Sequence, residues 1–127
     1  FPYTTLFRSR PWDTEAEPAG TQPLKPFTTG EDLYEKTVKC FDQLNPFFAD
    51  CLRKMKEMNH FDLESRKGKA PGGYNMTLPE IGVPFIFMNA AGLHRDVETL
   101  LHEAGHAFHT LAARGEKLIF LHRRQGR

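Results

Sequence analysis

This sequence of 127 residues has few cysteines, almost no net charge and no long uninterrupted apolar run. Its two cysteines, Cys40 and Cys51, make no disulfide framework, which favours a reducing compartment such as the cytoplasm. Lys and Arg total 17 against 16 for Asp and Glu, which argues against a nucleic-acid or membrane partner. The longest apolar run, IGVPFIFMNAAGL, is broken by Gly, Pro and Asn and predicts no membrane span. FPYTTLFRSR at the N-terminus lacks the apolar core of a secretory signal. We expect one cytoplasmic domain or a piece of one, of unspecified oligomeric state.

Two amphipathic helices are predicted in the first half of the chain. Residues 28–44, TTGEDLYEKTVKCFDQL, have helical periodicity, and Thr28 and Glu31 have the spacing of a capping box. Asn45 and Pro46 suit the N-cap and the first position of a second helix. Both helices have charged outer faces, which is typical of a scaffold.

The second half changes character twice. Residues 61–84 are rich in glycine, and the basic RKGK at 66–69 predicts a solvated loop, whereas PFIFMN at 84–89 predicts a short buried or edge strand. A third long helix is expected from about Leu93 to Ala113. The sequence therefore predicts a mainly α fold with a small β element.

This third helix contains the pattern HEAGH at residues 102–106. Four residues apart, His102 and His106 share one helix face, so both imidazoles can bind one zinc ion at about 2.0–2.1 Å. Glu103 would take a proton from a zinc-bound water, whose pKa the ion lowers to about 7. Gly105 costs about 1 kcal/mol in a helix relative to Ala, which suggests a packing or functional reason for it. The alternative is an exposed helix turn with two incidental histidines.

Two further residues lie on the same helix face. Glu98, one turn before His102, would accept the spare ring N–H of a ligand histidine, or it is an ordinary surface glutamate. His109 lies about 10.5 Å along the helix axis from His102, so we expect an outer-sphere or packing role for it and not ligation.

Three blocks in this order, FDLESRKGKAPGGY, PFIFMNAAG and DVETLLHEAGHAFH, resemble the M3 metallopeptidases, and most closely the oligoendopeptidase F group. The resemblance implies a zincin-like catalytic-domain fragment over residues 10–114, between an atypical N-terminal segment (1–9) and an atypical tail (115–127). It implies a zinc-dependent endopeptidase for oligopeptides, with Zn²⁺ on His102 and His106 and with Glu103 as general base.

By the same resemblance, FIFMN at 85–89 borders the cleft and pairs with the substrate backbone, and GKAPGGY at 68–74 forms part of the cleft wall. The residues expected to contact substrate are therefore Gly72, Gly73, Tyr74, Phe87 and Asn89, although Tyr74 and Asn89 could equally complete a turn or a strand.

The resemblance also implies a third zinc ligand, a glutamate on a later helix, which has no clear counterpart here. Glu116 is the only carboxylate after His106, and we do not expect it to substitute. The alternative function is therefore an inactive, truncated helical fragment with weak or no zinc binding. In that case the apolar face at Leu100, Leu101 and Phe108 would lack cover. A zincin of another family is a third alternative, which the flanking blocks disfavour.

Overall fold

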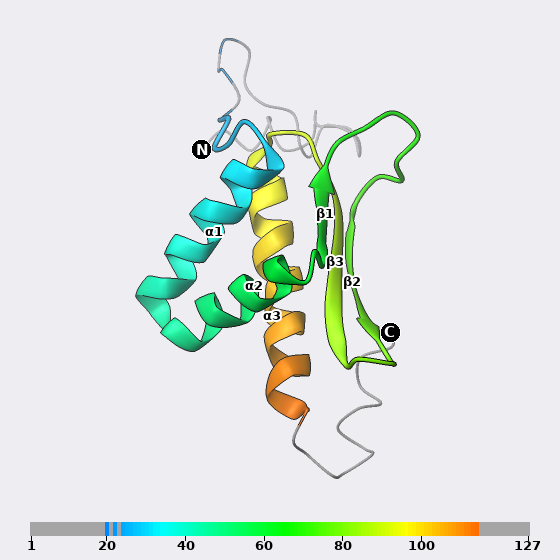
Figure 1. The fold of residues 1–127 in the computed structure, drawn as a ribbon. Coiled ribbons are helices and arrows are strands. Elements are labelled where there is room, and N and C mark those ends of the chain that lie inside the picture. The colour runs from blue at the N-terminus through cyan, green and yellow to red at the C-terminus, as the bar shows by residue number, and fades with distance from the viewer. Residues whose placement is uncertain (1–19, 21, 23, 115–127) are drawn as a thin grey trace, which may run out of the picture.

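A computed structural model describes residues 20, 22 and 24–114 of the chain. Three helices and three strands lie within them (Figure 1), in the order α1 (Gly30–Leu44), α2 (Pro46–Glu57), β1 (Phe61–Glu64), β2 (Gly73–Leu78), β3 (Val83–Ala90) and α3 (His94–Ala113). The predicted mainly α fold with a small β element is confirmed. The segments 1–9 and 115–127, expected to be atypical, lie outside the described residues.

The starts of α1 and α2 follow from local capping chemistry. The first cap is one residue later than predicted, because Thr29 and not Thr28 is the N-cap, and its side chain accepts from the Asp32 amide. Asp32 returns the contact by accepting from the Thr28 amide, so Asp32 takes the place predicted for Glu31. At α2 the prediction is confirmed, since the Asn45 side chain accepts from Phe47 N and Pro46 opens the helix.

The sheet contains two strands that the sequence did not indicate. Its order is β1-β3-β2, with β1 parallel and β2 antiparallel to β3. The basic RKGK at 66–69 lies in a loop between β1 and β2, as predicted, whereas the segments on either side of this loop form the two strands. With four residues, β1 is too short to be distinguished from a loop by periodicity, and β2 alternates with its polar residues, not its apolar ones, toward the helices.

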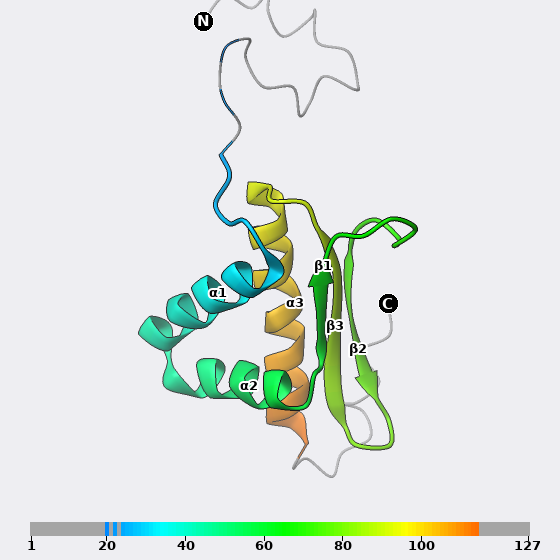
Figure 2. The ribbon, with the colours of Figure 1, turned by 45° about the horizontal axis from the view of Figure 1, so that its top comes forward.

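All three helices lie on one side of the sheet (Figures 1 and 2). Along β3, Pro84, Ile86 and Met88 face the helices and are fully buried. The alternate residues Phe85 and Phe87 are less buried and face the other side. We call these two sides of the sheet the helix face and the outer face.

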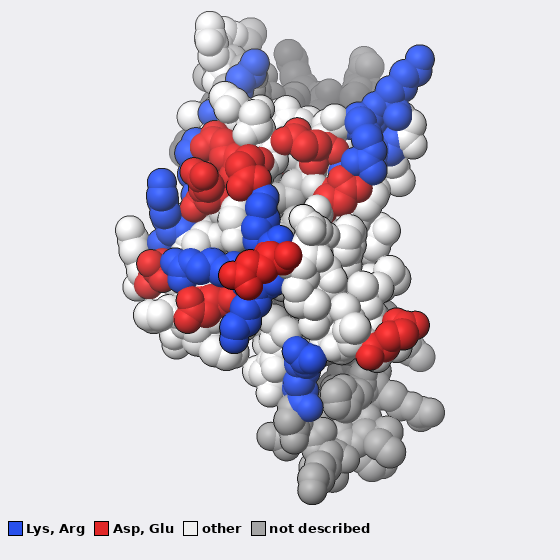
Figure 3. Space-filling model, in the orientation of Figure 1, with Lys and Arg blue, Asp and Glu red and all other residues white. Residues whose placement is uncertain are grey.

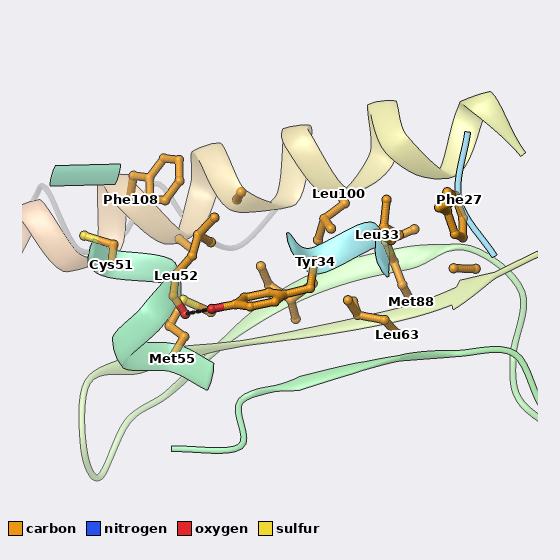
Figure 4. Packing of buried hydrophobic residues seen from close by; sticks show 14 of the residues in the cluster. Phe27, Leu33, Tyr34, Cys51, Leu52, Met55, Leu63, Met88, Leu100 and Phe108 are labelled. Carbon is orange, nitrogen blue, oxygen red and sulfur yellow. Dashed lines mark hydrogen bonds between the residues drawn. The ribbon is translucent and has the colours of Figure 1, made fainter. Parts of the chain in front are cut away.

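The core lies between the helices and the helix face of the sheet (Figure 4). Leu33 of α1, Leu52 of α2 and Leu100 of α3 meet there with almost no exposed surface. The Tyr34 hydroxyl donates to the Leu52 carbonyl and so connects α1 to α2 within this core. Truncation of Leu52 or Leu100 to Ala would cost about 2–5 kcal/mol, because each fills a closed space.

The apolar face of α3 is covered, contrary to the expectation for an inactive fragment. Leu100 is 1% exposed and Phe108 is 6% exposed, and Phe108 packs against the rings of Phe41 and Phe48. Leu101, at 37%, is the exposed member of the predicted set. The helices α1 and α2 therefore supply the cover that an inactive fragment was expected to lack.

The surface over α1 and α2 carries intermixed charges of both signs (Figure 3). Arg53 pairs with Asp42 and Asp50, and Lys56 pairs with Glu31 across the two helices. Exposed pairs of this kind contribute little to stability, and they give this surface no single sign of charge. Among the described helices, none combines the length and apolar character that a membrane crossing needs.

Candidate metal centre

The helix that carries HEAGH is held at its start by Asp96. The Asp96 carboxylate accepts from the backbone amides of Ala91 and Leu93, at 2.8 and 2.9 Å. These bonds fix the turn between β3 and α3 and place a negative charge at the positive end of the helix. The direction in which α3 leaves the sheet is thereby set.

His102 and His106 point their ring nitrogens at one another. Their Nε2 atoms lie 3.0 Å apart and their ring centroids 4.6 Å apart, and both residues are exposed on α3. Two ligands at about 2.0–2.1 Å from one tetrahedral ion have nitrogens a little over 3 Å apart. The two imidazoles therefore fit a shared metal ion, as the spacing predicted.

Glu103 lies in a different environment from the one expected. The sequence placed it beside the imidazoles on the polar face, but it is 9% exposed and its turn of α3 packs against β2. The side-chain amide of Asn75 in β2 donates to the Glu103 carbonyl at 3.3 Å. Glu103 thus occupies the junction between the histidine pair and the sheet.

The strand β2 follows α3 closely along its length. A Cβ atom on Gly73 would come within 2.7 Å of Thr99 Cγ2, so only glycine allows this approach. Further along, the Thr77 and Thr110 hydroxyl oxygens lie 3.5 Å apart. At about 100° per residue, Thr99, Glu103 and Thr110 form one stripe of α3, directly beside the stripe of His102 and His106.

Glu98 turns away from the histidine pair. Its carboxylate lies 3.6 Å from Nδ1 of His94, one turn toward the helix start, and both side chains are well exposed. Helical side chains lean toward the N-terminus, which favours contact with His94 over contact with His102. This geometry favours the surface alternative for Glu98. His109 lies exposed on α3, seven positions after His102.

The residues expected to contact substrate divide between the two faces of the sheet. Gly73 lies on the helix face against Thr99, whereas Tyr74 and Phe87 stack on the outer face with ring centroids 4.9 Å apart. Asn89 Nδ2 donates to the carbonyl of Lys69, and its Oδ1 is buried without a hydrogen-bond partner among the described residues.

Gly72 continues the pairing of β2 with β3. It has a φ of +92° and its carbonyl accepts from the Asn89 amide. The structure therefore brings Gly72 and Gly73 to the strand β2 and its start, beside α3. It places Tyr74, Phe87 and Asn89 around the outer face.

One part of the expected substrate contact is wrong. The strand 85–89 was expected to pair with a substrate backbone, but β3 lies between β1 and β2 and pairs with both. In the part of the chain that the structure describes, β2 has a strand on one side only. We call the side of β2 away from β3 its outer edge.

A third metal ligand does not lie near the histidine pair in the described part of the chain. Within residues 20, 22 and 24–114, His, Cys, Asp and Glu side chains form no group of three that could hold an ion. Glu116, which we did not expect to substitute, lies outside the described residues.

Gly105 lacks the packing reason that its position suggested. A Cβ atom built on it would meet no atom of the described residues within 4 Å, outside the backbone of its own helix turn. Alanine would therefore fit at this position, and no close packing in the described structure requires glycine between the two histidines.

Comparisons with known proteins identify the family of the chain. The sequence profile of peptidase family M3 matches residues 5–123. The chain belongs to peptidase family M3. The oligoendopeptidase F resemblance of the sequence blocks therefore lies within the family that the profile identifies. None of the curated proteins compared matches the chain.

Solved structures support this membership. A crystal structure described as an oligoendopeptidase F from Bacillus anthracis strain Ames is 30% identical with a TM-score of 0.70, over 80% of this chain and 18% of that one. A second structure described as an oligoendopeptidase F is 33% identical with a TM-score of 0.66, over 72% and 16%. PZ peptidase A with an inhibitor is 38% identical with a TM-score of 0.60, over 65% and 15%. The chain thus spans less than a fifth of the length of these M3 structures.

The residues that fasten β2 to α3 were not predicted from the sequence. Asn75 and Thr77 face the helix, and Met76 between them faces outward. The alternation in GYNMTL is a weak signal of such a strand, because polar residues here face a helix and an apolar one faces out. The sequence of β2 therefore has the period of two that is typical of a strand, but its polar residues face the packed side and its apolar residue faces outward.

Proposed function

We propose that this chain supplies two parts of a zinc-dependent endopeptidase that hydrolyses peptide bonds in oligopeptides. These parts are the metal-binding helix, α3, and the peptide-binding strand, β2. The observation that carries the proposal is the pair of converging Nε2 atoms, 3.0 Å apart, on the turn of α3 that also holds Glu103 against β2. Membership of peptidase family M3 supports the same reaction class.

The metal would be held by Nε2 of His102 and Nε2 of His106. Zinc suits these neutral nitrogen ligands, and when bound it supplies Lewis acidity toward a carbonyl oxygen and acidifies water. The exposed position of both rings leaves room for further ligands. The choice of zinc over other ions rests on the imidazole donors and on the family resemblance.

Glu103 is the proposed general base. It follows His102 directly, so its carboxylate can reach a water next to the imidazole pair, accept a proton and pass that proton to the leaving amine. Its low exposure limits competing contacts with bulk water. The bond between its carbonyl and Asn75 fixes this helix turn relative to β2.

The outer edge of β2 is the proposed binding surface for the peptide backbone. It replaces β3, the strand expected from the sequence. An extended peptide added to this edge would be held by main-chain hydrogen bonds, as in other cases of strand addition. Because β2 is fastened to α3 at Gly73, Asn75 and Thr77, such a peptide would run beside the histidine pair.

The second candidate is an inactive helical piece that binds metal weakly. It is favoured by the absence of a third ligand in the described residues. Zinc content of the purified full chain, together with cleavage of a quenched fluorescent peptide with and without chelator, separates the two. One tightly held zinc per chain and chelator-sensitive cleavage support the peptidase. Loose zinc and no cleavage support the inactive piece.

A further inference from the structure

The outer edge of β2 carries two half-exposed apolar side chains. Tyr74 is 49% exposed and Met76 is 50% exposed. Both point to the outer face of the sheet, because they pair with Phe87 and Phe85 of β3, whose neighbours Ile86 and Met88 fill the core. Large apolar side chains left open on an edge strand are uncommon, because they invite pairing with another strand.

The ring of Tyr74 is held in place by a residue of the neighbouring strand β3. It stacks on Phe87 with an interplanar angle of 19°, and the ammonium of Lys69 lies 4.7 Å from the centre of the Phe87 ring. The Lys69 side chain is 1% exposed, and its ammonium donates to both Asp62 and Glu64 of β1. Tyr74 is therefore the outermost member of a fixed row that crosses all three strands.

Hydrogen-bond alternation decides which backbone groups of β2 face outward. The Asn89 amide donates to the Gly72 carbonyl at 3.0 Å, so this opposed pair is of the hydrogen-bonded kind. By the alternation of antiparallel strands, Tyr74 and Met76 also direct their backbone groups toward β3. The backbone groups of Gly73 and Asn75 then face the outer edge.

A peptide that pairs antiparallel with this edge has a defined side-chain pattern. Its residues opposite Tyr74 and Met76 form non-hydrogen-bonded pairs, which bring Cα atoms to about 4.5 Å and side chains closest together. Their side chains lie on the outer face, beside the two exposed apolar groups. The intervening peptide residue points to the other side, where α3 lies.

We propose that Tyr74 and Met76 determine substrate specificity by selecting peptides with two large apolar side chains two residues apart. This inference rests on the proposed function, since it assigns the peptide to the outer edge of β2. It identifies the substrate class as oligopeptides with an apolar residue at alternate positions. In this inference the outer face of the sheet contributes to substrate recognition, in addition to the side of the sheet where the histidine pair of α3 lies.

Two labelled peptides of identical composition test the proposal. Each has two Phe residues in a Ser-rich host, placed at positions i and i+2 in one peptide and at i and i+1 in the other. Binding is measured by fluorescence anisotropy on the full chain with zinc, carrying Glu103→Gln so that the peptides are not cut. The i, i+2 peptide should bind about fivefold more tightly, because only its rings share a face. Equal affinities would overturn the proposal, as would no binding of either peptide.

Variants identify the residues responsible. Tyr74→Ser with Met76→Ser should remove the difference between the two peptides, and Met76→Ser alone should reduce it. Ile81→Ser is the matched control, because Ile81 is a 43% exposed apolar residue in the turn between β2 and β3. A difference that persists in the double variant would overturn the assignment. Loss of the difference in Ile81→Ser would do so as well.

Cleavage by the unmodified chain keeps this inference distinct from the proposed function. A chain that discriminates between the peptides but cleaves neither supports the inference and contradicts the peptidase proposal. A chain that cleaves both peptides at equal rates with equal affinity overturns the inference and supports the peptidase.

Discussion

The side-chain amide of Asn75 in β2 donates to the backbone carbonyl of Glu103 in α3, at 3.3 Å. This bond joins the edge strand to the proposed general base, and the two residues lie 28 positions apart in the chain. Because the carbonyl belongs to the turn that also holds His102, the bond relates the position of the strand to that of the histidine pair. The site is therefore a property of the packing between β2 and α3, and not of the helix alone.

Asn75→Ala should loosen the strand while leaving metal binding unchanged. Loss of the bond should lower the free energy of unfolding by about 1 kcal/mol, measured by urea denaturation. Peptide affinity should fall, because the outer edge of β2 is less firmly placed, whereas zinc affinity depends on His102 and His106. Asn59→Ala, in the turn after α2, serves as the stability control. Equal loss of zinc and peptide affinity in Asn75→Ala would contradict this assignment.

Gly73→Ala should destabilise the fold through a steric clash. A Cβ atom there would lie 2.7 Å from Thr99 Cγ2 and 2.9 Å from Met88 Cγ. Overpacking of this kind costs about 1–3 kcal/mol, measured as a shift of the denaturation midpoint. Adding Thr99→Ser removes the closer of the two atoms and should recover part of the loss. If the double variant recovers none of the lost stability, the clash is not with the side chain of Thr99.

Gly105→Ala should have the opposite effect. Its Cβ would meet nothing within 4 Å beyond its own helix turn in the described structure, and Ala is favoured over Gly inside a helix by about 0.5–1 kcal/mol. The melting temperature should therefore rise by a few degrees, with zinc affinity retained. A fall in either quantity would show that the glycine has a role that the described residues do not reveal.

The helix with the histidine pair could be predicted from the sequence because its evidence is local. A period of 3.6 residues places His102 and His106 on one face whatever surrounds the helix, and their nitrogens do converge. The burial of Glu103 could not be predicted in this way. It depends on β2, a strand that begins 30 residues earlier and that the sequence did not indicate.

The sheet shows the same limit. The strand 83–90 could be predicted from its continuous apolar run, but its central position depends on two partners, one of them the four-residue β1. Parallel pairing between Phe61 and Ile86 has no signature in either segment. The segment 84–89 is a strand, as predicted. It lies between two other strands, however, and so has no free edge in the described structure at which a peptide could pair.

Asp62 should make stability depend on acid pH. The Arg66 guanidinium, followed by the Lys69 ammonium, lowers the pKa of Asp62 from 3.8 to about 2. Because the folded pKa is depressed, the stabilisation is present above about pH 4 and is lost as the pH falls toward 2. It amounts to about 1–2 kcal/mol for this partly exposed carboxylate. Asp62→Asn should flatten the unfolding free energy over that range.

Glu103→Gln should abolish peptide hydrolysis while zinc is retained. The amide has nearly the shape of the carboxylate and fits the same buried position, but it cannot accept the proton of the attacking water. His106→Ala is the complementary change, because it removes one of the two converging nitrogens and should lower both zinc content and turnover. Zinc per chain and cleavage of a quenched peptide are measured on both variants. Undiminished turnover in Glu103→Gln, or loss of its zinc, would remove Glu103 from the role of general base and leave the histidine pair as the only assigned part of the site.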